Sequence, residues 1–153
     1  MGHIRSAARA LIVREGRLLL AHYRKSGYDF YAAPGGGQAE GETLPETLVR
    51  ECREEIGAEV EVSGLRFVRD YIVVGDSFSY LDESVHQVEH FFECRVPSTY
   101  QAGNGPSPDT HQVGVIWADA RALESLPVYP ARLREVVDPD RAAEMPVYLG
   151  DGD

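Results

Sequence analysis

The feature that most constrains this chain is a helix signal that directly follows a run of glycines. Thr43 and Glu46 have the spacing of a capping box, and Pro45 stands in the first turn, where proline is well tolerated. Gly57 occupies the position expected of a glycine that ends a helix. Between these limits, apolar side chains recur every fourth residue, at Leu44, Leu48, Cys52 and Ile56. This spacing predicts an amphipathic helix that buries one apolar stripe.

Three glutamates of this helix share one face. Glu51, Glu54 and Glu55 are spaced i, i+3 and i+4, which places their carboxylates side by side next to the apolar stripe. Crowded carboxylates repel one another unless a positive charge compensates, and an oxygen-rich cluster suits a hard cation such as Mg²⁺ or Mn²⁺. The alternative interpretation is a solvated acidic face with arginine partners. The glycines at 35–37 favour the cation, because glycine backbone can approach a metal or phosphate closely.

Composition limits the classes of protein to which the chain can belong. Its 153 residues are 43% hydrophobic and 26% charged, as in an ordinary globular domain. The 25 acidic and 15 basic residues give a net charge of −10, which would repel a DNA or RNA polymer. We therefore expect a single domain over residues 1–147 and a frayed tail over 148–153.

The cysteines and the N-terminal region also exclude several classes. Cys52 and Cys94 are the only cysteines and form no cluster with histidine, so neither a structural zinc site nor a disulfide framework is expected. The apolar run at 7–13 is too short to span a membrane and lacks the form of a secretory signal. We expect a cytoplasmic protein with no membrane partner.

Strands are predicted on both sides of the helix. Residues 6–13 and 17–23 have the pattern of a hairpin around Glu15-Gly16, and a short apolar stretch ends at Pro34. Further strands are predicted at 59–62, 65–74, 87–96 and 113–117, a long surface loop at 97–110, and helices at 121–126 and 130–137. Strand groups separated by a helix predict an α/β fold with a mixed β-sheet between helices.

From Gly36 to Ala58 the chain follows the spacing G-x5-E-x7-R-E-U-x-E-E-x-G-U, where U is an aliphatic residue, and so resembles the Nudix family. Every glycine and charged position of this motif is filled. Cys52 and Ala58 are smaller than the aliphatic residues usual at their positions. The resemblance extends over residues 5–137 and implies a Nudix-type α/β/α sandwich.

The resemblance also implies a metal-dependent pyrophosphohydrolase, an enzyme that cleaves the diphosphate linkage of a nucleoside diphosphate derivative. The implied ligands of Mg²⁺ or Mn²⁺ are three carboxylates and one backbone carbonyl: Glu51, Glu54, Glu55 and Gly36 or Gly35. Arg50 and Glu42 are implied as a pair that braces the motif and orients these ligands.

The general base is left open between several acids. Glu54 can both bind metal and accept a proton, whereas the family often takes its base from a downstream loop, where Glu83, Glu89 and Asp109 are candidates. Alternation along the strand places Glu89 on the same side as Gln87. The alternative interpretation makes Glu89 a structural acid.

The favoured substrate is ADP-ribose or a nucleotide sugar, because residues 35–38 and 86–89 resemble those of bacterial Nudix proteins with such substrates. A (d)NTP pyrophosphohydrolase of the housecleaning type is the alternative. A non-catalytic, ligand-sensing Nudix module is a remote alternative, which the four intact glutamates of the motif disfavour.

Other residues give weaker information about partners. Tyr28, Phe30 and Tyr31 could stack on a base or simply pack in the core. The expected partner is a small-molecule nucleotide, and the family resemblance is compatible with a homodimer.

Overall fold

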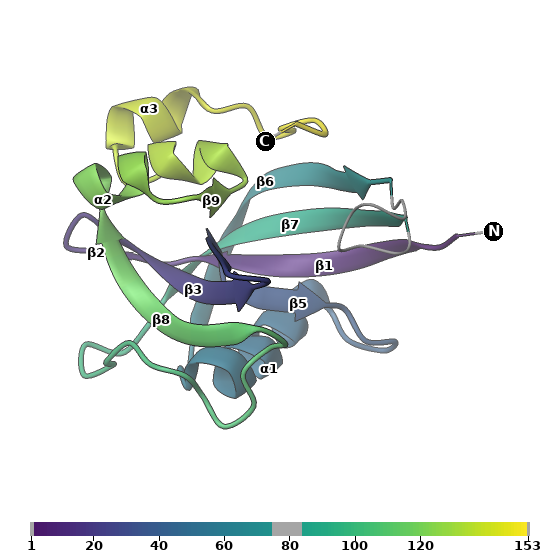
Figure 1. Ribbon diagram of the computed structural model, residues 1–153, viewed down its shortest axis with the longest axis horizontal. Helices are drawn as coiled ribbons and strands as arrows, with labels where there is room; N and C mark the ends of the chain where they lie inside the picture. Colours follow the sequence, from purple (N-terminus) through teal and green to yellow (C-terminus); the bar gives the residue numbers. More distant parts are fainter. Residues whose placement is uncertain (1, 75–83, 153) are drawn as a thin grey trace.

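The computed structural model describes residues 2–74 and 84–152, whose strands form two mixed sheets between helices (Figure 1). The first sheet has the order β5 (Gly35–Gly37), β1 (Ile4–Leu11), β7 (Val85–Arg95) and β6 (Glu61–Val73). In it β1 and β7 run parallel, while β5 and β6 are antiparallel to their neighbours.

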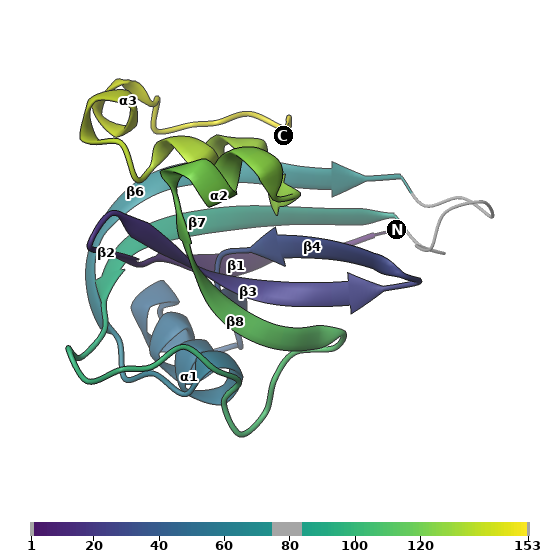
Figure 2. The same ribbon diagram turned by 60° about the vertical axis from the view of Figure 1, so that its left-hand side comes forward.

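The second sheet is built around β3 (Arg17–Lys25). Its order is β2 (Val13–Arg14), β3, β4 (Tyr28–Ala32) and β9 (Val128–Tyr129), and β8 (Gln112–Asp119) also pairs with β3. Helix α1 (Leu44–Ile56) covers one side of the sheets (Figure 2). The opposite side carries α2 (Ala120–Ser125), the 3₁₀ helix η1 (Ala131–Glu135) and α3 (Pro139–Glu144). The α/β/α sandwich expected from the sequence is therefore confirmed.

The two layers of core follow from alternation along β3. Leu19 points to the cluster that contains Leu48 and Ile56 of α1, whereas Leu18 and Leu20 point to the cluster under α2 and η1. Because both faces of the sheets are covered, apolar residues are buried in continuous runs rather than at every second position.

The predicted hairpin between 6–13 and 17–23 is largely wrong. Around the predicted turn, only the short strand Val13–Arg14 pairs with β3, and the Leu19 N–H donates to the carbonyl of Ile12 at 2.9 Å. The rest of the predicted first strand is β1, which belongs to the first sheet. We expected one mixed sheet, but the structure has two mixed sheets, because the chain passes from one to the other after β1.

Further differences lie in element boundaries. The strands predicted at 59–62 and 65–74 are one strand, β6, whose register irregularities between Val62 and Phe67 accommodate Gly64. The helix predicted at 130–137 is the shorter η1, and α3 was not predicted. Asp138 as N-cap followed by Pro139 was the signal available for α3.

The tail expected to fray beyond residue 147 is attached to β6. The backbone N–H of Leu149 donates to the carbonyl of Val68 at 2.8 Å, and that of Asp70 donates to Gly150 at 2.9 Å. The Tyr148 hydroxyl donates to the Asp70 carboxylate at 2.6 Å. These contacts satisfy open backbone groups on an edge strand. Fraying of the tail stays a prediction. Among the described helices, none is long and apolar enough to cross a membrane.

Candidate functional site

Helix α1 begins and ends as its sequence predicts. The Thr43 side chain accepts from the Glu46 backbone N–H, and the Glu46 carboxylate accepts from the Thr43 N–H at 3.1 Å. At the other end Gly57 adopts a left-handed conformation with φ of 65°. These two caps fix the direction of the helix and thus the face that carries the glutamates.

The glycines of β5 are required by close approaches. A Cβ at Gly35 would overlap the carbonyl oxygen of Ala8 on β1. A Cβ at Gly36 would lie 2.6 Å from the carboxylate carbon of Glu51. The Glu51 carboxylate therefore lies directly over the Gly36 backbone, in space that any other residue would fill.

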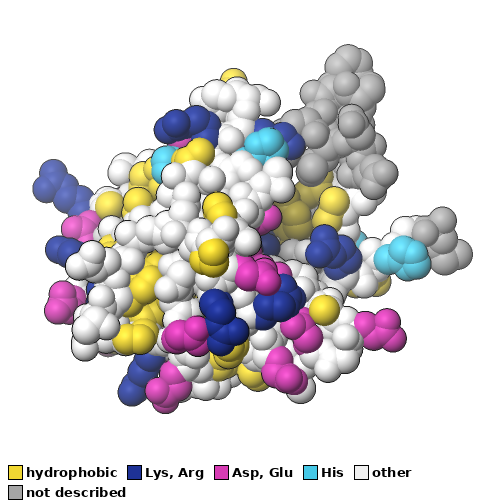
Figure 3. Space-filling model, turned by 90° about the horizontal axis from the view of Figure 1, so that it is seen from below, with side chains coloured by type: hydrophobic (Ala, Val, Ile, Leu, Met, Phe, Trp, Pro, Cys, Tyr) yellow, Lys and Arg dark blue, Asp and Glu magenta, His cyan; other side chains and the backbone are white. Residues whose placement is uncertain are grey.

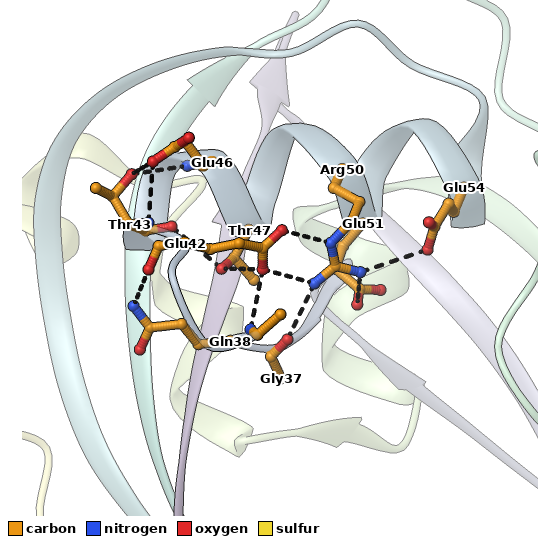
Figure 4. Close-up of polar contacts among 10 residues, drawn as sticks. Gly37, Gln38, Glu42, Thr43, Glu46, Thr47, Arg50, Glu51 and Glu54 are labelled. Atoms are coloured by element: carbon orange, nitrogen blue, oxygen red, sulfur yellow. Dashed lines mark hydrogen bonds and ion pairs between the residues drawn. The ribbon is translucent and has the colours of Figure 1, made fainter.

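Arg50 holds the loop and the helix together (Figure 4). Its guanidinium donates to both carboxylate oxygens of Glu42, at 2.7 and 2.9 Å, and to the carbonyl of Gly37 at 3.2 Å. It also donates to Glu51 at 2.7 Å, and its Nη1 lies 3.6 Å from Glu54 Oε2. The bracing contact expected between Arg50 and Glu42 is thus present in the structure.

Glu42 is tuned to remain ionised. Its carboxylate accepts from Arg50, from the backbone N–H of Ala39 and from the Thr47 hydroxyl, and these contacts lower its pKa to about 2. The pair therefore keeps its charges over the whole neutral range.

Glu55 has the opposite environment. Its side chain is 3% exposed, and its Oε2 accepts from the backbone N–H of Gly35 at 3.4 Å. Burial, together with the adjoining carboxylate of Glu51, raises the pKa of Glu55 to about 9, although the charge of Arg9 opposes the shift. Glu51 and Glu55 are therefore two crowded acids, and their contact together with burial favours the neutral form of Glu55.

Glu54 does not join this pair. Its side chain is 45% exposed and is turned toward Arg50. Within the described ranges, no three acidic, histidine or cysteine side chains converge as a set of metal ligands. The structure thus brings together Glu51 and Glu55 of the predicted trio and leaves Glu54 apart.

A cleft of about 1110 Å³ lies beside the glycine loop and is lined from both sheets. Tyr28 and Phe30 of β4 line it, whereas Tyr31 stacks on His22 with ring centroids 4.5 Å apart. Asp109 and Glu89 both line the cleft. The remaining base candidate, Glu83, lies outside the described residues.

Glu89 is enclosed by donors. Its carboxylate accepts from Arg69 Nε at 2.7 Å, from Arg9 Nε at 2.9 Å and from the Gln87 amide at 3.1 Å. Burial alone would raise its pKa, but the two guanidinium groups outweigh burial and the pKa is lowered. The predicted side-by-side placement of Gln87 and Glu89 is confirmed.

The loop at 97–110 is more than the surface connection expected from its composition. The Gly105 N–H and the Gln112 amide both donate to the carbonyl of Glu55 at 2.9 Å. The Tyr100 hydroxyl donates to the carbonyl of Ile56 at 2.7 Å. The loop therefore satisfies the C-terminal carbonyls of α1. Nothing in local periodicity could have indicated these contacts, because they join distant segments.

Seen from the side of α1, the surface carries interspersed acidic and basic side chains (Figure 3). A basic stripe of the kind that binds nucleic acid is not evident on this face. The expectation that no nucleic-acid polymer binds stays a prediction.

The fold and the site together define a class: an α/β/α domain in which a glycine strand leads into a glutamate-bearing helix. A family model described as the NUDIX domain matches residues 3–138. The chain therefore belongs to the Nudix family.

Comparison with individual proteins gives more distant relationships. The nucleoside triphosphatase NudI of Enterobacter sp. (strain 638) is 35% identical over 66 residues, which are 42% of this chain and 47% of that protein. The match thus spans about half of that relative's length.

Solved structures match over most of the chain. The MutT NUDIX hydrolase from Burkholderia pseudomallei is 25% identical, with a TM-score of 0.63 over 87% of this chain and 96% of that one. An ADP-ribose pyrophosphatase from Streptococcus suis 89-1591 is 21% identical, with a TM-score of 0.57 over 99% and 100% of the two chains.

Proposed function

We propose that the protein is a metal-dependent Nudix hydrolase that cleaves the diphosphate linkage of a nucleoside diphosphate derivative. The observation that carries this proposal is the crowding of Glu51 and Glu55 over the backbone of Gly35 and Gly36. Arg9 connects this place with the cleft, because it lines the cleft and donates to the Gly35 carbonyl. Two adjoining carboxylates at a glycine backbone are costly unless they bind something positive.

The donor set fits a divalent cation. It consists of oxygen atoms alone, which hard cations such as Mg²⁺ and Mn²⁺ prefer. Burial, and after it the neighbouring carboxylate of Glu51, raises the pKa of Glu55, and a bound cation would favour its ionised form. Glu51, Glu54, Glu55 and the carbonyl of Gly36 or Gly35 would hold the cation. When bound, it would neutralise diphosphate charge and help to orient the attacking water.

The residues of the chain have separate roles in this proposal. Arg50 and Glu42 hold the helix and the glycine loop in a fixed relative position. Their ion pair persists throughout the neutral pH range, because the pKa of Glu42 is low. Glu54 is exposed and can turn, and it is our first choice for the group that accepts the proton of water. Asp109 in the cleft is the second choice.

The favoured substrate is ADP-ribose or a nucleotide sugar. The cleft of about 1110 Å³ has room for a nucleotide with a second group attached, and Tyr28 and Phe30 offer it aromatic rings. The Streptococcus suis structure carries the name of an ADP-ribose pyrophosphatase, which supports this choice. The alternative, hydrolysis of (d)NTPs, is supported by the name of the Enterobacter relative, a nucleoside triphosphatase.

A substrate panel tests the proposal. ADP-ribose, UDP-glucose and the dNTPs are incubated with the protein in the presence of Mg²⁺ or Mn²⁺, and phosphate-containing products are scored. We expect a higher kcat/KM for ADP-ribose or the nucleotide sugar than for any dNTP, and loss of turnover with EDTA. The reverse order would favour the (d)NTP alternative. If the folded protein cleaves none of these substrates with either metal, this result would contradict the proposal that it is an enzyme and would favour a ligand-sensing module.

A further inference from the structure

We infer that Glu89 is a positioning residue rather than the general base: it holds Arg9, and Arg9 holds the glycine loop beside Glu55. The inference rests on the proposed function, because that loop belongs to the proposed cation site. It assigns to Arg9 a role that no sequence motif indicated.

Both oxygens of the Glu89 carboxylate accept hydrogen bonds from neighbouring side chains. One oxygen accepts from Arg69 Nε at 2.7 Å, and the other accepts from Arg9 Nε at 2.9 Å and Gln87 Nε2 at 3.1 Å. The Glu89 side chain is only 5% exposed. A general base must offer a lone pair to water. Glu89 does not meet this condition, since both of its oxygens face donors.

Arg9 also contacts the backbone that leads into the glycine loop. While its Nε donates to Glu89, its Nη1 donates to the carbonyl of Gly35 at 3.2 Å and reaches that of Ala33 at 3.4 Å. Arg9 therefore connects the centre of the first sheet to the start of β5. The planar guanidinium makes these contacts in a fixed geometry, which a lysine could not reproduce.

The glycine loop in turn contacts Glu55, one of the two crowded acids. Gly35 is held by Arg9 at its carbonyl, and its own N–H donates to Glu55 Oε2 at 3.4 Å. Because Gly35 has no side chain to pack, its position depends on such backbone contacts. A continuous chain of polar contacts thus runs from Glu89 through Arg9 and Gly35 to Glu55.

Strand register supplies the reason that these residues meet. Arg69 on β6 is the direct cross-strand partner of Glu89 on β7, and Arg9 lies on β1, the neighbouring strand on the other side. The carboxylate therefore stands between two arginines on adjoining strands. Arg9, Glu89 and Arg69 all line the cleft, and within this group two guanidinium charges face one carboxylate.

The experiment measures Mn²⁺ affinity by the loss of the free-ion EPR signal, together with kcat across pH, for Glu89→Gln, Arg9→Lys and the double variant. We expect each single variant to bind Mn²⁺ about tenfold or more weakly, as is usual when a residue that orients metal ligands is changed. The double variant should be no weaker than the poorer single variant, because both changes break one link. At saturating Mn²⁺, the acid limb of the kcat profile should stay where it is in the unaltered protein.

The control is Glu93→Gln. Glu93 pairs with Arg66 at 3.3 Å between the same two strands, β6 and β7, but lies on the exposed surface. Its replacement should change neither Mn²⁺ affinity nor the kcat profile.

Several outcomes would overturn the inference. An unchanged Mn²⁺ affinity in both single variants would do so, as would a Glu89→Gln variant whose kcat at saturating Mn²⁺ falls by ~10²–10⁴ with loss of the acid limb, the effect of removing a base. If Glu89→Gln does not fold, Arg9→Lys decides, since Glu89 then keeps Arg69 and Gln87. An unaltered protein that neither binds Mn²⁺ nor turns over any substrate would refute the proposed function, and this inference with it. Turnover by the unaltered protein with no effect of the variants would refute this inference alone.

Discussion

Gly36 shows how much one absent side chain can decide. The Glu51 carboxylate occupies the space over its backbone, with both oxygens 2.8 Å from where a Cβ would stand. A methyl group added at Gly36 would meet only the far end of a flexible side chain, so the fold can accommodate it. The Glu51 carboxylate would have to move, however, and the proposed site depends on the position of that carboxylate.

At this scale we predict that Gly36→Ala lowers kcat/KM by about 10–100-fold, while the melting temperature changes little. The physical reason is that Glu51 must leave its place beside Glu55. The matched control is Gly64→Ala on β6, where a Cβ would meet nothing within 4 Å. Steady-state kinetics and thermal denaturation monitored by circular dichroism measure both variants. Equal activities for the two would contradict the proposed role of Gly36.

Helix α1 is held at both ends by different means. Its N-terminus is capped by its own neighbours, Thr43 and Glu46, whereas its C-terminal carbonyls are satisfied by a loop some fifty residues further along the chain. Gln112 is the centre of the second arrangement. Its amide donates to Glu55 and to Asn104, and its oxygen accepts from the backbone N–H of Asp109 at 3.0 Å.

At the scale of this element we predict that Gln112→Met lowers the free energy of unfolding by ~1–3 kcal/mol, since buried polar groups lose their partners. The substitution keeps the volume of the side chain and removes only its hydrogen bonds. Gln101→Met, in the exposed part of the same loop, serves as the control and should have almost no effect. Urea denaturation gives both values, and similar stabilities for the two variants would contradict the role assigned to Gln112.

At the scale of the whole molecule, packing of α1 against the first sheet buries both cysteines. Cys52 on α1 and Cys94 on β7 belong to the same buried cluster, and neither is in a disulfide. Burial raises the pKa of the Cys94 thiol to about 12 and raises that of Cys52 as well. Because the thiolate is the reactive form, both groups are protected by burial and by protonation.

We therefore predict that the native protein reacts with DTNB at pH 8 far more slowly than a free thiol does. Both thiols should react promptly in 6 M guanidinium chloride, which serves as the reference for complete reaction. The measurement is the absorbance of released thionitrobenzoate with time. Rapid labelling of either cysteine in the native protein would show that the core opens locally, against the packing described above.

Local interactions made α1 and its surroundings predictable. The capping box, the terminal glycine and the fourfold apolar spacing act within a few residues of one another, so each could be recognised in the sequence and is present in the structure. The resemblance to the Nudix family likewise implied Arg50 and Glu42 as a pair, and their contact is present in the structure.

Contacts between distant segments were decided only by the tertiary structure. The division into two sheets depends on where the chain crosses after β1, and local periodicity cannot indicate a crossing. The pairing of the tail with β6, the attachment of the 97–110 loop to α1, and the Arg9–Glu89–Arg69 cluster all join residues of separate elements, 20 positions apart for Arg69 and Glu89 and 80 for Arg9 and Glu89. Helical pitch placed three glutamates on one face, and in the structure Glu54 lies 3.6 Å from Arg50 Nη1 and is partly exposed, whereas Glu55 is buried. The sequence by itself thus determined the helix, the family and the candidate acids. Contacts with the glycine strand and with arginine side chains determined which donors surround those acids.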